Sequence, residues 1–208
     1  MVETIEQAPA FDTTPGNWLC LDFTHTLDSR YDAHPRELLK DYSDLVLWGK
    51  YVHILKADEA RSLCEEATNH PVEASAALGR AIVLREAIYR IFLAIAEDAS
   101  PQEDDLATLN AALSEAMSHT RIVPKDGSFA WDWAGREIDL NSILWQVVRS
   151  AADLLTDEEL DDVRACAAED CRWLFVDTSK NRSRRWCDMK TCGNRSKARR
   201  HYERKKQA

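Results

Sequence analysis

Residues 166–206 read CAAEDCRWLFVDTSKNRSRRWCDMKTCGNRSKARRHYERKK and place four cysteines in two C-x4-C pairs, with fifteen residues between the pairs. Two such pairs around a strand-like stretch and a turn can present four thiolates to one tetrahedral metal ion, most often zinc. The alternatives are four buried thiols or two disulfides. We favour zinc, because a module of about fifty residues is too small for an apolar core of its own. The predicted ligands are Cys166, Cys171, Cys187 and Cys192.

The segment between the two pairs is predicted to form a β-hairpin. Residues 172–177 (RWLFVD) alternate as a half-buried strand does, residues 179–183 supply a turn, and residues 184–187 return toward the first pair. We expect Gly193 to take a φ angle that other residues resist, which would turn the chain away from the metal. Asn194 is then predicted to cap a helix that begins at Arg195.

The end of the chain is strongly basic. From Lys180 onward, twelve Lys and Arg stand against two acids, a local charge of +10, so the other 179 residues carry −19 within the net charge of −9. The plainer interpretation of such a run is a solvated helix face or a frayed tail. We favour nucleic-acid binding, because cations at this density repel one another unless a polyanion neutralises them. The predicted contacts are Arg195, Lys197, Arg199, Arg200, Arg204 and Lys205.

Within this final helix we expect a division of roles. Ala198 and Tyr202 are four residues apart and predict an inner stripe against the metal hairpin. Arg195 and Arg199 lie near the rigid metal site and are predicted to read bases, whereas His201 is a phosphate or base contact at best. We expect the hairpin aromatics to form its core rather than a stacking platform, which favours duplex DNA over single strands. These aromatics are Trp173, Phe175 and Trp186.

The body, residues 1–160, is predicted to be mainly α with a minor β-hairpin, and residues 161–208 to be a small zinc-bound β-hairpin plus helix module. Apolar residues at helical spacing and start signals predict five helices. A turn at residues 125–128 precedes alternating aromatics and predicts the hairpin. The predicted helices cover residues 42–55, residues 58–64, residues 71–97, residues 100–117 and residues 141–155, and the hairpin aromatics are Phe129, Trp131 and Trp133.

The first segment of the body, NWLCLDFTHTLDSR at residues 17–30, contains a compact apolar run that is either a buried strand or the first turns of a helix. Asp22, Thr24 and His25 interrupt its apolar run. They are candidates for a polar ligand pocket. The competing interpretation, which we favour, is a buried polar network whose members hydrogen-bond to one another and to the adjacent backbone.

Composition and length limit the function classes. A chain of 208 residues with 45% hydrophobic residues is long enough for one well-buried core plus a small appended module. No signal pattern and no apolar run of roughly 20 residues is present, so we expect a cytoplasmic protein without a membrane partner. The sequence has no G-x-S-x-G, P-loop or dinucleotide fingerprint, and we predict that it is not an enzyme. Cys20 and Cys64 lie in apolar settings and are expected to be core residues.

The four residues Cys192, Gly193, Asn194 and Arg195 closely resemble the signature of the CGNR zinc-finger family. The upstream segments WLCLDFTHT and LREAIYRIF resemble the ABATE-type helical domain that accompanies this finger in bacteria. The resemblance covers nearly the whole chain. It implies a stress-related transcriptional regulator whose zinc is bound by the four cysteines named above. The family commonly has Asn where this chain has His25, so no family-wide role passes to that side chain.

We therefore expect a one-component regulator. The helical body would sense a small-molecule effector or mediate association, for example into a homodimer, and the zinc module would bind DNA. The alternative is a small-molecule-binding or enzymatic body whose zinc module binds RNA or a protein partner. Selection of binding sites from random duplexes, with RNA as competitor, separates the two.

Overall fold

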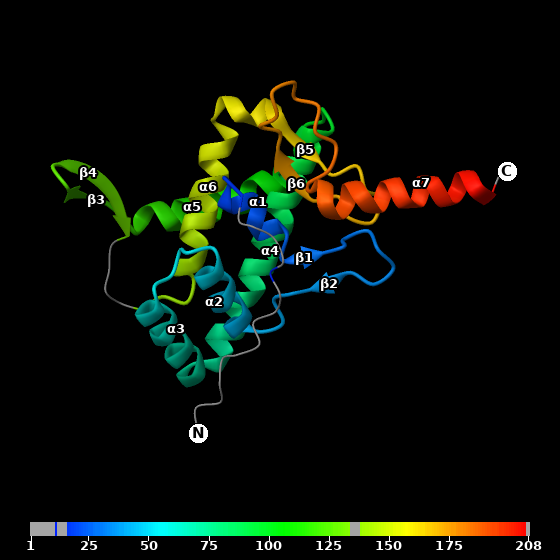
Figure 1. The fold of residues 1–208 in the computed structure, drawn as a ribbon. Coiled ribbons are helices and arrows are strands. Elements are labelled where there is room, and N and C mark those ends of the chain that lie inside the picture. The colour runs from blue at the N-terminus through cyan, green and yellow to red at the C-terminus, as the bar shows by residue number, and fades with distance from the viewer. Residues whose placement is uncertain (1–10, 12–15, 134–137, 207–208) are drawn as a thin grey trace.

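The computed structural model describes residue 11, residues 16–133 and residues 138–206, and it is mainly α with small antiparallel strand pairs (Figure 1). The long helix α4 (Pro71–Ala96) runs through the middle of the body. Packed against it are α1 (Leu19–Thr24), α2 (Tyr42–Tyr51), α3 (Ala57–Asn69) and α5 (Glu103–Ser118). Helix α6 (Ser142–Leu155) packs on α1 and α5 and completes the bundle.

Helix α4 forms where the sequence predicts it. Pro71 occupies the first turn, where its missing N–H needs no partner. Ile88, Ile91 and Phe92 are fully buried and belong to the core that the body helices share. A helix with so broad an apolar face is stabilised mainly by the helices packed around it.

The predicted ends of three helices were wrong. Helix α2 stops at Tyr51 because His53 adopts a left-handed φ of 61°, and the N–H groups of the next two residues bond back to the Gly49 carbonyl. Helix α3 continues past Cys64 to Asn69. Helix α5 begins at Glu103 rather than at residue 100. These ends depend on local backbone geometry, which the periodicity of apolar residues does not encode.

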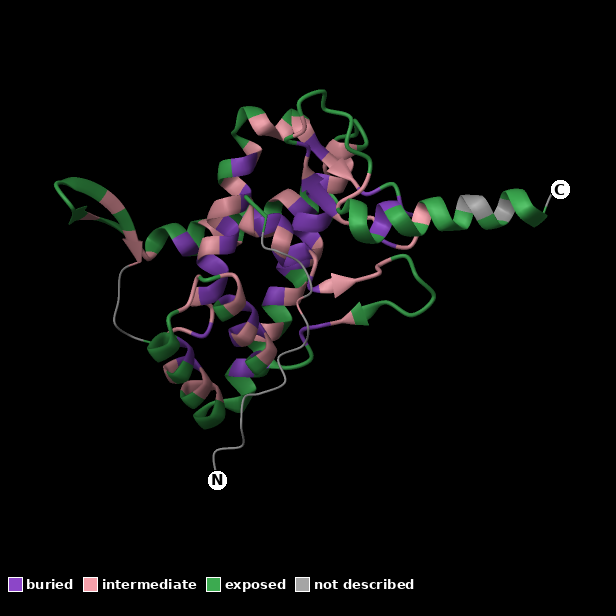
Figure 2. Ribbon diagram, viewed as in Figure 1, coloured by how far each residue is buried: buried purple, intermediate pink, exposed green. Residues whose placement is uncertain are grey.

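The predicted aromatic hairpin is confirmed. Strands β3 (Thr120–Lys125) and β4 (Ser128–Trp133) pair antiparallel around a tight turn in which Asp126 and Gly127 both have positive φ. Ile122 faces Trp131 across the strands, and Pro124 faces Phe129. The hairpin projects from the body, and much of it is exposed (Figure 2).

Two further strand pairs position the C-terminal part. The short strands β1 (Leu27–Asp28) and β2 (Arg36–Glu37) form one pair. The other joins β5 (Val163–Ala165) to β6 (Leu174–Val176). Because strand side chains alternate in direction, Leu174 lies in the body core, whereas Phe175 packs with Cys166, Cys171 and Cys192 in a second cluster. Strand β6 therefore belongs to both cores.

The predicted pairing within the zinc module was wrong in one respect. Strand β6 pairs with β5, which precedes the first cysteine pair, and residues 184–187 form no strand. They still return to the first pair, since the Arg185 carbonyl accepts from the Ala167 N–H at 2.8 Å. Pairing with β5 has a physical advantage, because it buries Val163 and Leu174 in the body core.

The chain ends in two helical elements, the π-helix η2 (Met189–Gly193) and helix α7 (Asn194–Lys206), which extends away from the body (Figure 1). The predicted boundary between residues 160 and 161 falls inside the short 3-10 helix η1 (Glu158–Asp162) and stays a prediction. A search of the described helices for one of sufficient length and apolarity to span a bilayer finds none.

Candidate metal centre and nucleic-acid interface

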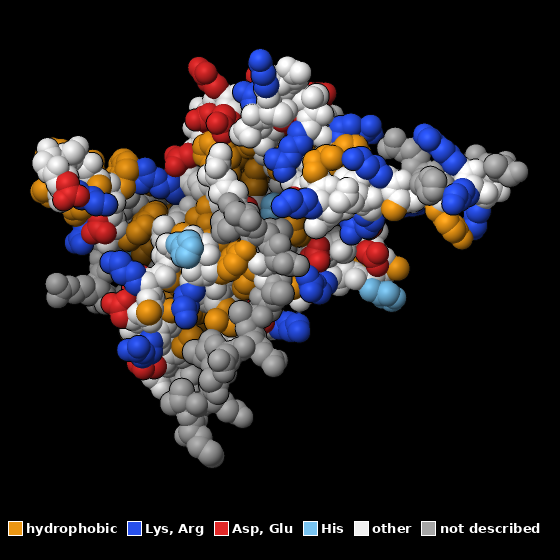
Figure 3. Space-filling model, viewed as in Figure 1, with side chains coloured by type: hydrophobic (Ala, Val, Ile, Leu, Met, Phe, Trp, Pro, Cys, Tyr) orange, Lys and Arg blue, Asp and Glu red, His pale blue; other side chains and the backbone are white. Residues whose placement is uncertain are grey.

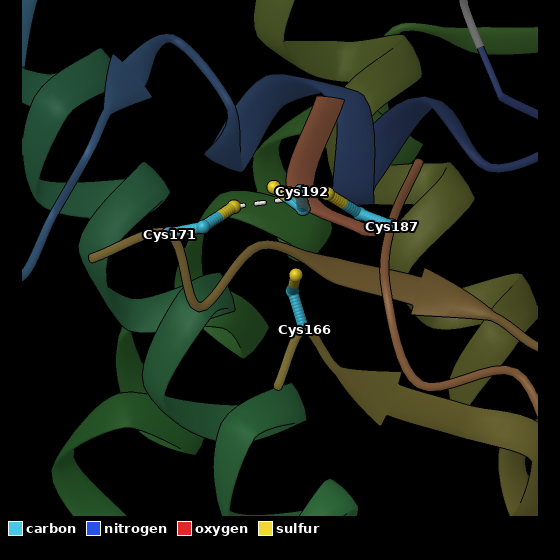
Figure 4. Close-up of side chains that lie close together, drawn as sticks. All are labelled: Cys166, Cys171, Cys187 and Cys192. Carbon is cyan, nitrogen blue, oxygen red and sulfur yellow. Dashed lines mark hydrogen bonds between the residues drawn. The ribbon is translucent and has the colours of Figure 1, made fainter. Parts of the chain in front are cut away.

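The four predicted cysteines come together at one point (Figure 4). Their sulfur atoms all lie within 4.8 Å of one another, and the Cys187 sulfur is 3.7 Å from those of Cys171 and Cys192. Ligands at about 2.3 Å from a tetrahedral ion are separated by about 3.8 Å, which matches this spacing. All four are free thiols, and 3.7 Å is far too long for a disulfide bond.

The four thiols of the cluster interact strongly with one another, so the pKa is lowered at Cys166 and Cys192 and raised at Cys171 and Cys187. Hydrogen bonds from the neighbouring thiols, that of Cys171 first, hold the pKa of Cys166 well below its usual range. Burial raises the pKa of Cys20 to about 12, as expected of a core thiol. A thiolate is the form that binds zinc, so the chemistry of the donor set fits this ion at the cluster.

Backbone and carboxylate contacts hold the cysteines in place. The Cys166 N–H donates to the Trp173 carbonyl at 2.8 Å, which links the first cysteine to β6. The buried carboxylate of Asp177 accepts from the N–H groups of Ser179 and Arg184 and fixes the turn between the pairs. Asp188 caps η2 by accepting from the Thr191 N–H at 2.7 Å. Sequence reasoning missed both carboxylates, although an Asp followed by Ser or Thr is a recognised turn and cap signal.

The predicted roles of Gly193 and Asn194 were wrong. The φ angle of Gly193 lies outside the left-handed region, and what this position requires is space, since an added Cβ would meet the Met189 sulfur at 3.0 Å. Asn194 is the first helical residue of α7 rather than its cap, and its side-chain amide donates to the Lys190 carbonyl at 3.0 Å. Both differences arise because η2 leads into α7 without a break.

Helix α7 carries the predicted nucleic-acid contacts on an extended, exposed surface. Figure 3 shows Lys and Arg side chains gathered on this helix and at its base. Lys197, Arg204 and Lys205 are exposed, and the side chains of Arg200 and His201 lie outside the described part of the structure. The predicted inner stripe of Ala198 and Tyr202 was wrong, because both residues are exposed.

The two arginines predicted to read bases form ion pairs with acids of the first cysteine loop, the residues between Cys166 and Cys171. Arg195 contacts Asp170 at 3.1 Å and the Cys192 sulfur at 3.4 Å. Arg199 contacts Glu169 at 3.0 Å, with both side chains exposed. The sequence alone gave no signal for these pairs, since the partners are 25 and 30 residues apart along the chain.

Asp22 and Thr24 lie in helix α1 and His25 is its C-cap, which resolves the choice between strand and helix. Thr24 is buried and donates to the Leu21 carbonyl at 2.7 Å, as a structural residue does. Asp22 accepts from the Gly16 N–H at 2.8 Å, and His25 bonds through Nε2 to the Leu174 carbonyl at 2.9 Å. Asp22 and His25, but not Thr24, also line a cavity of about 760 Å³. It lies between the helical body and the part of the chain that holds the four cysteines, which we call the finger. A ligand role for these residues stays a prediction.

Burial shifts both titrating groups of this segment toward their neutral forms. It raises the pKa of Asp22 to about 7 and lowers the pKa of His25 to about 4. The His25 ring also stacks on Trp173, with ring centroids 4.3 Å apart. Helix α1 is therefore in direct contact with the strand that leads out of the first cysteine pair.

Comparison with known families gives two adjoining matches. Residues 17–158 match the model of the ABATE family, described as "Putative stress-induced transcription regulator". Residues 163–205 match the model of the CGNR zinc finger, and this range includes all four cysteines. A search of curated proteins found no match.

Proposed function

The chain belongs to the ABATE family, and on that premise we propose that it is a DNA-binding transcription regulator built on a four-cysteine zinc finger. Cys166, Cys171, Cys187 and Cys192 would hold one Zn²⁺, and the helical body would act as sensor or association domain. The ion supplies no redox chemistry and serves to fix the chain around it. We place the protein in the cytoplasm, where thiols stay reduced and can bind metal.

The observation that carries the proposal is the position of α7. This helix starts directly at the cysteine cluster, so a metal there would hold its first turn rigidly. Its far part extends from the molecule with Lys197, Arg204 and Lys205 exposed. An exposed basic helix on a rigid base is suited to lie along a nucleic-acid groove and contact its phosphates.

The uneven charge of the chain indicates from which side DNA would approach it. The 179 residues before Lys180 carry −19 and would be repelled by DNA, whereas the last 29 carry +10. A duplex should therefore approach from the side of α7. Arg195 and Arg199 would exchange Asp170 and Glu169 for phosphates or base edges as the helix docks.

Fluorescence anisotropy of the zinc-loaded chain tests the proposal, with duplexes carrying a randomised centre and a series of salt concentrations. Lys205→Ala should weaken binding to all sequences alike and make the salt slope shallower by about one unit. Lys125→Ala is the matched control, because Lys125 is an exposed lysine on the β3–β4 hairpin. Affinity that is indifferent to salt, or equal losses in both variants, would contradict the assignment to α7.

Two further measurements address the partners. RNA of the same length is added as competitor, and displacement of the duplex by RNA at equal concentration would favour RNA as the natural ligand. We also propose that the body associates into a homodimer, which sedimentation of the zinc-loaded chain tests directly. A monomer at micromolar concentration would reject that part of the proposal alone.

A further inference from the structure

The cavity of about 760 Å³ lies where the body meets the finger. Helix α1, the β1–β2 pair and α2 line its body side, and β6, η2 and the start of α7 line its finger side. This volume is within the range of about 300–1,000 Å³ that small-molecule sites occupy. Cys171, Cys187 and Cys192 also line it, so part of this volume belongs to the metal site, and the rest lies between the two family domains.

Once Asp22 is deprotonated, above its pKa of about 7, two acceptors face each other in this cavity without a donor between them. Asp22 Oδ2 accepts from Gly16, but Asp22 Oδ1 lies 3.9 Å from His25 Nδ1. His25 Nε2 must donate to the Leu174 carbonyl, because a carbonyl only accepts. In the neutral ring Nδ1 is then an acceptor as well. A ligand with several N–H donors would satisfy both atoms at once.

Asp22 also lacks a cation, unlike other buried charges of the body. Arg85 is 2% exposed and pairs with Glu37 and Glu86, and the buried Asp105 pairs with Arg90. The Asp22 side chain is 12% exposed, yet no Lys or Arg of the described residues forms an ion pair with it. The buried Asp177 carboxylate also lacks an ion pair with a described residue but accepts from two backbone N–H groups, whereas Asp22 accepts from one, so a cationic ligand would supply the missing partner.

Two tryptophans line the same cavity as this carboxylate, and His25 covers one face of Trp173. Trp18 lies one helical turn before Asp22, and Trp173 stacks on His25, which places both indoles at this end of the cavity. Arginines cover other rings, for example Arg184 over Phe175, but within the described ranges none covers Trp18 or Trp173. Aromatic faces next to a carboxylate are the combination that binds organic ammonium ions.

We propose that this cavity is a binding site for a small organic ammonium ion, held by Asp22 and His25 Nδ1 against Trp18 and Trp173. An anionic ligand is disfavoured beside Asp22, because the deprotonated carboxylate would repel it. Two of the cations that line the cavity also have acidic partners. Arg36 pairs with Asp28 at 3.1 Å, and Arg195 with Asp170. Lys190 makes no ion pair with a described residue, but it is exposed to solvent. The role of this cavity as an effector site rests on the proposed function, whereas the binding of an ammonium ion there does not.

Titration calorimetry of the zinc-loaded full chain tests the proposal with 2-phenylethylammonium as probe and 2-phenylethanol as its neutral counterpart. We expect saturable binding of the ammonium, and binding of the alcohol weaker by about tenfold or more. Asp22→Asn keeps an oxygen for Gly16 and should weaken the ammonium by a similar factor. Asp28→Asn is the matched control, because Asp28 lines the same cavity but is already paired with Arg36, and it should change affinity by less than about threefold.

Circular dichroism of each variant establishes that it is folded, and the comparison of the two probes on the unaltered chain does not depend on any variant. Absence of saturable ammonium binding would overturn the proposal. So would equal binding of the alcohol, or unchanged affinity in folded Asp22→Asn. No DNA takes part in the titration, so these failures are distinct from a failure of the proposed DNA-binding function.

Discussion

The imidazole of His25 stacks on the indole of Trp173, with ring centroids 4.3 Å apart and planes 12° from parallel. The two residues come from opposite ends of the chain and from the two matched family domains. Trp173 in turn accepts the Cys166 N–H through its carbonyl, so the C-cap residue of α1 is linked to the cysteine cluster through two contacts. The finger is thus part of the body's packing rather than a separate unit on a tether.

Replacing Cys187 by Ser should release the metal. We expect one Zn²⁺ per unaltered chain, and the loss of a ligand should remove much of a binding free energy on the order of 10 kcal/mol. Since β6 contributes Leu174 to the body core, the melting temperature of the body should fall as well. Elemental analysis and tryptophan fluorescence measure the two effects. Cys64→Ser, outside the cluster, is the control, and full zinc occupancy in Cys187→Ser would refute the four-cysteine site.

Leu174→Ala tests the sharing of β6 between the two cores. Leu174 is fully buried, and truncation of such a residue costs about 2–5 kcal/mol of unfolding free energy. The same variant should weaken zinc retention against a chelator, because Leu174 directly follows Trp173, whose carbonyl accepts the Cys166 N–H. Urea unfolding gives the first quantity and a chelator competition the second. Ile122→Ala, at a position 60% exposed, should change stability by less than about 0.5 kcal/mol. A loss of stability without any change in zinc retention would show that the two cores do not depend on each other through β6.

Glu169→Gln should strengthen DNA binding. Its carboxylate contacts Arg199 at 3.0 Å and competes with phosphate for the same guanidinium. Because both side chains are exposed, we expect a gain of only about two- to fivefold at low salt. The gain should vanish in an Arg199→Ala background, which a double-mutant cycle measures. Glu115→Gln, an exposed acid on α5, should have no effect, and a gain that persists without Arg199 would exclude this pair as its cause.

The Asp22 carboxyl should make stability fall as pH rises. Its pKa is raised by burial from 3.8 to about 7, so between these values the folded chain keeps a proton that the unfolded chain has lost. Stability from this group is therefore full below pH 3.8 and lost on the way to pH 7, where the deprotonated carboxylate is buried. The difference between the unaltered chain and Asp22→Asn in urea unfolding should decline by more than about 1.4 kcal/mol, the value of one pKa unit. A flat or rising difference would contradict the shift.

Local sequence patterns were sufficient to predict much of the fold and to identify the four residues that can bind a metal. The apolar stripe of α4, the Pro71 start and the turn before β4 are encoded within a few residues of each other. The paired cysteine spacing is equally local, and the structure brings the four sulfurs together as predicted. Helix ends at Tyr51 and Asn69 were missed, since they depend on single backbone angles and on packing.

Contacts between distant segments were beyond such patterns. The sequence pattern predicts a strand that includes residues 174–176 but does not reveal which segment pairs with it. Strand β5 pairs with it instead of residues 184–187, because this register buries Val163 and Leu174 in the body core. Likewise the charge of Arg199 is evident from the sequence, whereas its pairing with Glu169 follows from the way the first cysteine loop folds back on α7. Short-range chemistry sets which elements form and which side chains can bind a metal. Burial of apolar surface between segments far apart in the chain sets how those elements meet, and so places Asp22 and His25 in the cavity beside the cysteines.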